Sequence, residues 1–116
     1  MTTEPSTEDL IDILKILREI IMSLQKFIDS DDYKFIEDAR SSCHKLMNNH
    51  RLSNYDLSGK MDLVKNVESM YEKIKSRKNG LDLLEHGLLV QQAVYTITRA
   101  NIMAVGIEFK LKRSKG

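Results

Sequence analysis

Apolar residues recur every three or four positions along most of this 116-residue chain. The longest stripe comprises Leu10, Ile13, Leu14, Leu17, Ile20, Ile21, Leu24 and Ile28. That spacing places these residues on one face of an α-helix. Ser6 or Thr7 can cap the helix, because the acidic residues that follow suit a helix N-terminus. Ile11 and Ile16 widen the stripe, so we expect this helix to be covered on more than one side.

Two further segments repeat the pattern. After the acidic segment 29–32, a second helix is expected, with an apolar face formed by Ile36, Ala39, Cys43, Leu46 and Met47. Residues 48–59 are rich in Asn, Ser and Gly and predict a loop. A third helix is expected within residues 60–80, with a face formed by Met61, Val64, Val67, Tyr71 and Ile74. Asn79 and Gly80 supply its C-terminal stop.

The stretch from Gly87 to Gly106 is the most apolar part of the chain and allows three interpretations. A membrane span is disfavoured, because polar residues such as Gln91 and Arg99 are costly at bilayer depth. A single strand is disfavoured, because strands usually run about three to ten residues. A helix fits best, with the alternative of a break near Gly106 followed by a short strand over residues 107–112.

Read as a helix, this stretch is apolar on two sides. One face comprises Leu84, Leu88, Tyr95, Ile102, Val105 and Phe109. The second comprises Leu83, Val90, Val94, Ile97 and either Met103 or Ala104. A helix that is apolar on two sides is typical of a central position among several neighbours. We therefore expect both faces, Leu88 and Tyr95 included, to be buried.

These elements predict an all-α fold, an up-and-down four-helix bundle with a basic C-terminal tail. A five-helix bundle is the alternative if residues 51–59 contain a helical turn. We expect residues 1–6 to be a flexible N-terminus, 7–109 a single bundle domain and 110–116 the tail. Five methionines on or beside the stripes are expected to fill the core, although an exposed methionine groove would suit a partner helix: Met22, Met47, Met61, Met70 and Met103.

Composition indicates a globular chain, with 41% hydrophobic and 30% charged residues. The single cysteine, Cys43, cannot form an internal disulfide, which is typical of a reducing compartment. The opening residues MTTEPSTED lack the basic and apolar regions of a secretory signal. We expect an intracellular protein, cytoplasmic or nuclear, without membrane attachment.

Charge is distributed unevenly along the chain. Residues 1–40 carry ten acidic and five basic residues, and residues 41–116 carry seven acidic and thirteen basic ones. The basic residues cluster twice, as Lys73, Lys75, Arg77 and Lys78 and as Lys110, Lys112, Arg113 and Lys115. Both clusters are candidate electrostatic contacts, for example to nucleic-acid phosphates, and the second could also act as a nuclear import signal. The alternative is that acidic and basic helix faces meet within the fold and that the cations complement helix C-termini.

No catalytic, cofactor-binding or metal-binding pattern is found. Gly59-Lys60 lacks the upstream glycine and strand of a phosphate-binding loop. Cys43 and His44 are adjacent and would point about 100° apart on a helix, which makes them a poor nucleophile and base pair. His44, His50 and His86 are too scattered to propose a metal site, and each is expected to lie on the surface or in a loop. We therefore expect a protein that is not an enzyme and needs no cofactor.

Two segments, REIIMSLQ and LVKNVESMYEKIKSRKNG, resemble parts of the helical integrase-binding type domains of transcription coactivators. The resemblance covers under half of the chain, and no binding residues are carried over. It implies a nuclear role in holding short peptide segments of partner proteins.

The leading hypothesis is a small helical interaction module, an adaptor or regulatory subunit that binds a helix or peptide of another protein. Homo-oligomerisation is also compatible with the sequence. The alternative is a nucleic-acid-associated regulatory factor that uses the basic C-terminal half of the chain.

Overall fold

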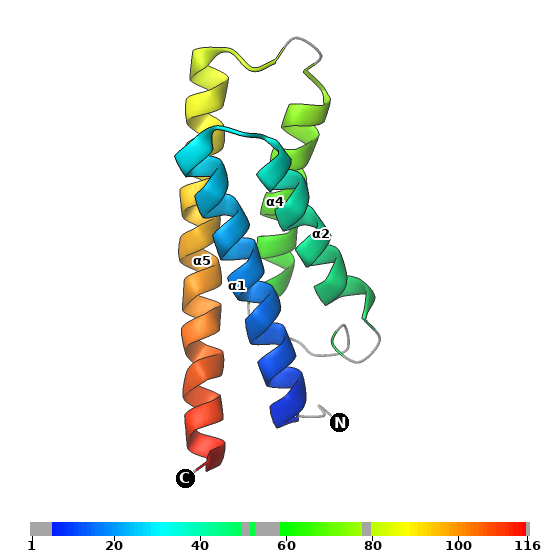
Figure 1. Cartoon of the computed structure of the whole chain (residues 1–116), viewed down its shortest axis with the longest axis vertical. Coiled ribbons are helices and arrows are strands. Elements are labelled where there is room, and N and C mark those ends of the chain that lie inside the picture. Colours follow the sequence, from blue (N-terminus) through cyan, green and yellow to red (C-terminus); the bar gives the residue numbers. More distant parts are fainter. Residues whose placement is uncertain (1–5, 50–51, 53–58, 78–79, 116) are drawn as a thin grey trace.

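The computed structural model describes residues 6–49, 52, 59–77 and 80–115. Its helices are α1 (Thr7–Ser30), α2 (Lys34–Asn48), α4 (Lys60–Lys75) and α5 (Leu83–Lys115), as Figure 1 shows. These described segments contain no strand, so the predicted all-α fold is confirmed. The alternative of a break near Gly106 and a strand over residues 107–112 is wrong, because α5 runs through both. The predicted flexible N-terminus and the possible fifth helix fall largely outside the described residues.

The four helices run up, down, up and down around a common core (Figure 1). In the described part of the chain, α1 packs against α2 and α5, and α4 packs against the same two helices. Each helix therefore has two neighbours. The 33 residues of α5 correspond to about 50 Å of helix. This length matches the longest dimension of the molecule, 51 Å, so α5 extends from one end of the bundle to the other.

Local capping explains where the helices begin and end. The Ser6 side chain accepts a hydrogen bond from the Asp9 amide at 3.1 Å, as the sequence predicted. Asp31 ends α1 in the left-handed conformation, with φ of 60°, and its amide donates to the Phe27 carbonyl. Before α5, the Asp82 carboxylate accepts from the Glu85 amide at 2.7 Å. Side chains thus satisfy amides at the starts of helices, and a backbone turn satisfies a carbonyl at the end of α1.

The core is built on α1. Its buried apolar side chains are Leu10, Ile13, Ile16, Leu17, Ile20, Leu24 and Phe27. They meet Ile36, Ala39, Cys43 and Leu46 of α2, Leu63, Val67 and Met70 of α4, and Leu89, Ala93, Ala100, Ala104 and Ile107 of α5. Leu52, within the segment predicted as a loop, is also buried. The predicted apolar faces of the first two helices are therefore confirmed in their main residues.

The prediction that the last helix is central is wrong, because α5 covers only one side of the bundle. The face that contains Leu88 and Tyr95 is exposed to solvent, whereas the side chains of Ala93 and Ala100 point into the core. The helix with the most extensive contacts is α1, which packs against α5 and α2 along its length. A ring of four helices gives each member only two neighbours, so a helix with two apolar faces keeps one uncovered.

The prediction that the methionines fill the core is correct only in part. Met70 is fully buried and Met103 packs against the core. Met22 and Met61 are 58% and 51% exposed. In α4 the core face is formed by Leu63, Val67 and Met70, so the helix is rotated away from the face predicted through Met61.

The extensive packing of α1 leads to a stability prediction with a matched control. Ile20 is fully buried, whereas Ile11 on the same helix is 44% exposed. Replacing Ile20 by alanine removes buried methyl groups and leaves a cavity, so Ile20→Ala should lower the free energy of unfolding by about 2–5 kcal/mol. Ile11→Ala should change it by no more than about 0.5 kcal/mol. Urea denaturation followed by circular dichroism measures both, and equal losses would contradict the assignment of α1 as the core helix.

Candidate functional site

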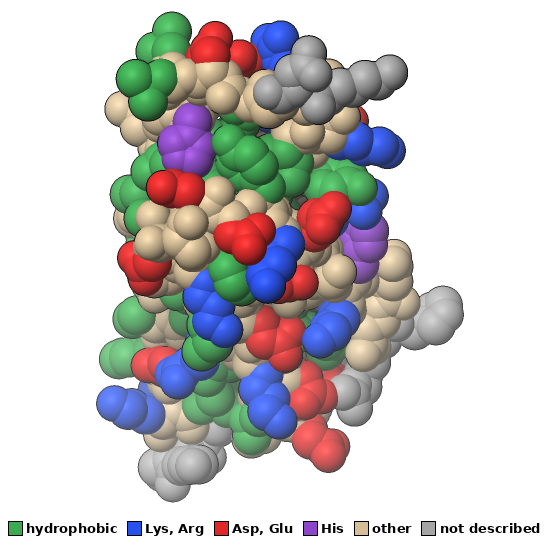
Figure 2. All heavy atoms as spheres, turned by 45° about the horizontal axis from the view of Figure 1, so that its top comes forward, with side chains coloured by type: hydrophobic (Ala, Val, Ile, Leu, Met, Phe, Trp, Pro, Cys, Tyr) green, Lys and Arg blue, Asp and Glu red, His purple; other side chains and the backbone are tan. Residues whose placement is uncertain are grey.

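The most unusual surface of the protein is the outward face of α5. Seven apolar side chains of α5 are between 49% and 73% exposed. Val94 is one, and we call the other six the outer stripe: Leu84, Leu88, Tyr95, Ile102, Val105 and Phe109. Hydrophobic side chains are visible along the edge of the molecule that α5 forms, on the left of Figure 2. Single exposed apolar residues are ordinary, but several large ones along one face of a helix are typical of an interaction site.

The outer stripe follows a seven-residue repeat. Leu88, Tyr95, Ile102 and Phe109 are each seven positions apart, and Leu84 and Val105 belong to a second row offset by four. Two rows with this offset form the seam that one helix presents to another in a coiled coil. The stripe extends over about 38 Å, which is the rise of 25 residues.

Few charges interrupt this surface. Between Gly87 and Gly106 the only charged residue is Arg99, whose Nε lies 3.8 Å from the Asp62 carboxylate of α4. A Cβ atom added at either glycine would meet no atom within 4 Å. Glycine inside a helix costs about 0.5–1 kcal/mol relative to alanine, and packing within this chain does not require it at these two positions.

A hollow of about 550 Å³ adjoins the outer stripe between α1 and α5. Its apolar lining includes Met22 of α1 and Ile97 and Val105 of α5. Arg18 of α1 and Glu108 of α5 form an ion pair at this boundary. Because Val105 belongs to both, the apolar surface continues from the outer stripe across to an exposed methionine, a flexible side chain that adapts to different partners.

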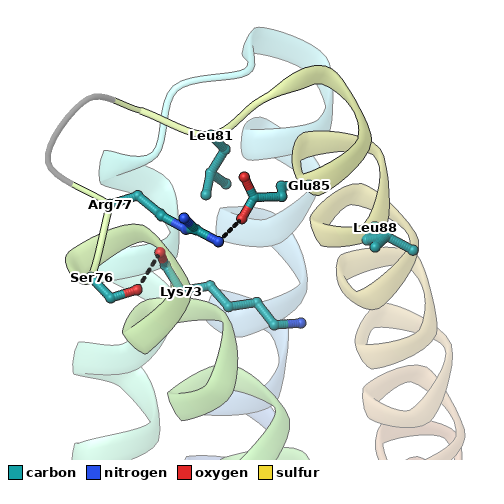
Figure 3. A pocket seen from close by; sticks show the side chains of 6 residues that line it. All are labelled: Lys73, Ser76, Arg77, Leu81, Glu85 and Leu88. Carbon is teal, nitrogen blue, oxygen red and sulfur yellow. Dashed lines mark hydrogen bonds and ion pairs between the residues drawn. The ribbon is translucent and has the colours of Figure 1, made fainter.

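The first predicted basic cluster lies at the end of α4 and is engaged within the fold. Figure 3 shows a smaller pocket of about 280 Å³ there, with the Arg77 guanidinium directed at Glu85. Their closest atoms are 2.6 Å apart. The Lys73 ammonium donates to the Gln92 side chain at 2.9 Å, and that of Lys75 lies 5.8 Å from the centre of the Tyr71 ring. Lys78 lies outside the described residues.

The second basic cluster is at the opposite end of the bundle. Lys110, Lys112 and Arg113 are exposed on the last turns of α5, and Lys115 is its final residue. Figure 1 places this end of α5 far from the end of α4. The structure therefore does not bring the two predicted clusters together into one surface.

Cys43 and His44 do not form a reactive pair. Cys43 is fully buried, and burial, with a smaller contribution from the Glu68 charge, raises the pKa of its thiol to about 12. His44 Nε2 lies 3.2 Å from Glu68, which also accepts a hydrogen bond from Arg40 at 2.9 Å. A protonated, buried thiol is a poor nucleophile. The prediction that Cys43 is a small core residue is confirmed.

His86 has an environment that the sequence did not indicate. Its Nδ1 lies 3.1 Å from the Tyr33 hydroxyl, and its Nε2 lies 2.9 Å from the Asp31 carboxylate. The ring also packs edge-on against Phe27. Burial and the nearby Asp31 charge raise the pKa of Tyr33. This chain of hydrogen bonds ties the turn between α1 and α2 to the first turn of α5. His86 therefore lies half-buried at the surface, on the first turn of α5, with partners that the sequence did not indicate.

The remaining chemistry and the comparisons add no further site. Among the described residues, no group of three or more His, Cys, Asp and Glu side chains is arranged to hold a metal ion. No helix in the same residues has the length and hydropathy required to cross a membrane. Comparison with known protein families, curated proteins and solved structures finds no match to this chain. The partial resemblance to coactivator domains therefore gains no further support.

Two adjacent leucines test the orientation of α5. Leu89 is fully buried and Leu88 is 51% exposed. Leu89→Ala should lower the free energy of unfolding by about 2–5 kcal/mol, because it leaves a cavity in the core. Leu88→Ala should lower it by less than about 1 kcal/mol. Urea denaturation in dilute solution compares the two variants, and a larger loss for Leu88→Ala would mean that α5 is rotated from the orientation described.

The buried thiol leads to a prediction of pH dependence. The unfolded chain releases the Cys43 proton near the ordinary value of 9.0, whereas the folded chain holds it to about pH 12. Between these values the unfolded state binds fewer protons, so stability falls as pH rises. Wild-type protein should therefore lose more stability between pH 8 and pH 10.5 than Cys43→Ala does. Denaturation at both pH values measures the difference, and parallel losses in the two proteins would contradict the assigned burial.

Proposed function

We propose that this protein is a small non-catalytic interaction module, an adaptor or regulatory subunit that binds a partner helix along the outer face of α5. The observation that supports the proposal is the outer stripe, an uncovered apolar surface on a helix whose other side already forms part of the core. A partner that covered this surface would gain about 25 cal/mol of binding free energy for each Å² of apolar surface removed from water.

The shape of the surface favours a helix as the partner. Apolar anchors that recur at three, four and seven positions are the pattern by which helices recognise other helices. The hollow beside Met22 widens the apolar surface toward α1 and offers room for a large side chain of the partner. Aromatic residues are enriched among the side chains that contribute most to binding, and Tyr95 and Phe109 are both exposed here.

The nucleic-acid alternative has less support from the geometry. Arg77 is paired with Glu85 and Lys73 donates to Gln92, so the cluster at the end of α4 is already engaged. The exposed cations Lys110, Lys112 and Arg113 lie at the other end of the bundle. A nuclear location, which the sequence resemblance implied, stays a prediction.

Site-specific photocrosslinking tests the proposal. A photoreactive phenylalanine analogue placed at Ile102 lies on the outer stripe, and the same group at Met61 of α4 is a control of comparable exposure. Irradiation in native extract should give a protein adduct at Ile102 that maps to a helical segment, and none at Met61. An equal yield at the two positions, or no protein adduct at Ile102, would contradict the proposal.

A variant without two exposed cations distinguishes helix binding from nucleic-acid binding. Lys112 and Arg113 are exposed at the end of α5 and lie outside the outer stripe. Lys112→Ala/Arg113→Ala should leave the Ile102 adduct in place, because rim charges act mainly on the encounter rate. Micromolar binding of generic DNA or RNA at physiological salt that this variant abolishes would favour the nucleic-acid function instead.

A further inference from the structure

The two rows of the outer face match each other when one copy of the helix is reversed. One row is Leu88, Tyr95, Ile102 and Phe109, and the other is Leu84, Gln91, Thr98 and Val105. All eight residues are exposed. Suppose that a second copy of α5 packs antiparallel to the first, with the two-fold axis between Thr96 and Ile97. Each residue of one row then lies at the same height along the pair as a residue of the other row in the partner helix; we call such a height a level. The levels pair Leu84 with Phe109, Leu88 with Val105, Gln91 with Ile102, and Tyr95 with Thr98.

This alternation is the pairing that an antiparallel coiled coil requires. Both ends of the seam pair apolar residues with apolar residues, and the centre pairs the large Tyr95 with the smaller Thr98. A two-fold contact of this kind is isologous, so one surface serves both partners and the assembly closes at two copies.

The two exposed glycines obey the same symmetry. Gly87 of one helix lies level with Gly106 of the other, and each glycine has open space around it. Removing the Cβ at these levels lets the two backbones approach more closely, as small residues do at helix contacts. Packing within one chain does not require these two glycines. In the pair, they would allow the two helices to approach closely.

Charge favours the antiparallel direction. The start of α5 carries Asp82 and Glu85, with Asp31 held beside it by His86, and Glu85 is paired there with Arg77 of α4's C-terminal side. The end of α5 is basic, with Lys110, Lys112 and Arg113 exposed. An antiparallel pair places Asp82 and Asp31 of one copy toward these exposed cations of the other, whereas a parallel pair would bring the cations of the two copies together. The macrodipoles of the two helices also oppose each other when the pair is antiparallel.

We propose that the helix which covers the outer stripe is α5 of a second copy of this chain, packed antiparallel about a two-fold axis between Thr96 and Ile97. The inference rests on the proposed function and names its partner. A covering helix must present apolar residues over about 38 Å, must place carboxylates toward the exposed cations at the end of α5, and must leave space opposite each glycine. The outer face of α5 meets all three requirements.

The native mass of the full chain is the first test and needs no substitution. Sedimentation equilibrium at micromolar concentration should give twice the mass of one chain. Leu88→Glu/Val105→Glu places two carboxylates in one level of the seam and should weaken dimerisation by about tenfold or more. Met61→Glu, at a similarly exposed apolar residue of α4, should leave the dimer intact. A monomer for the wild-type chain, or equal weakening by both variants, would overturn the inference.

Disulfide trapping tests the direction of the pair. Leu84→Cys and Phe109→Cys are prepared as two separate variants, in which the native Cys43 is buried and remote from the seam. On oxidation of a mixture, the antiparallel pair should yield a disulfide between the two different variants. A parallel pair would instead link two Leu84→Cys chains, because like positions face each other, and that result would overturn the inference.

The outcomes also separate this inference from the proposed function. A monomeric chain whose Ile102 adduct contains a different protein would overturn the inference and leave the proposed function standing. A monomeric chain without any protein adduct at Ile102 would overturn both. An Ile102 adduct that contains a second copy, together with the mixed disulfide, supports both.

Discussion

The packing of α1 between α2 and α5 is the constraint on which the rest of the structure depends. Ile13, Leu17, Ile20, Leu24 and Phe27 are fully buried along α1. Burying each such side chain contributes about 1.5–3 kcal/mol, so this one stripe supplies a large part of the driving force for folding. The alanines on the inner face of α5 allow that helix to lie close to α1. Once this contact forms, the direction in which the outer face of α5 points is decided.

Polar contacts then set how the other helices meet this pair. Gln92 of α5 donates to the Asn66 carbonyl of α4 and accepts from Lys73 of the same helix. Glu68 of α4 accepts from Arg40 of α2 in the same way. Apolar packing tolerates small rotations and sliding, whereas hydrogen bonds of defined geometry do not. Gln92, a polar residue within the most apolar stretch of the chain, thus holds α5 against α4.

The sequence predicted which segments are helical far better than it predicted which faces are buried. Periodicity identified the four described helices and the core face of α1, and local residue types limited the first cap to Ser6 or Thr7, because these features depend on residues close in the sequence. Both faces of α5 satisfy helical spacing, so periodicity could not decide which one α1 covers. The core face of α4 was predicted in part: Val67 is buried and Val64, Tyr71 and Ile74 pack against the core, but Met61 is exposed and the fully buried Leu63 and Met70 lie outside the predicted face. The partners of His86 lie 53 and 55 residues away, a distance over which no local pattern carries information.

Side-chain size on α5 gives the last step of the argument. Its buried face includes three alanines, Ala93, Ala100 and Ala104, while the larger Tyr95 and Phe109 are exposed. A chain whose helix served only its own stability would place large apolar residues inside and small or polar ones outside. The reversed distribution follows from two separate requirements. The side chains of the inner face must be small enough for α1 to pack closely. Those of the outer face must provide contact area and large anchoring residues for a second helix. The large exposed side chains add little to the stability of one chain, and contact with a second α5 accounts for both their size and their spacing.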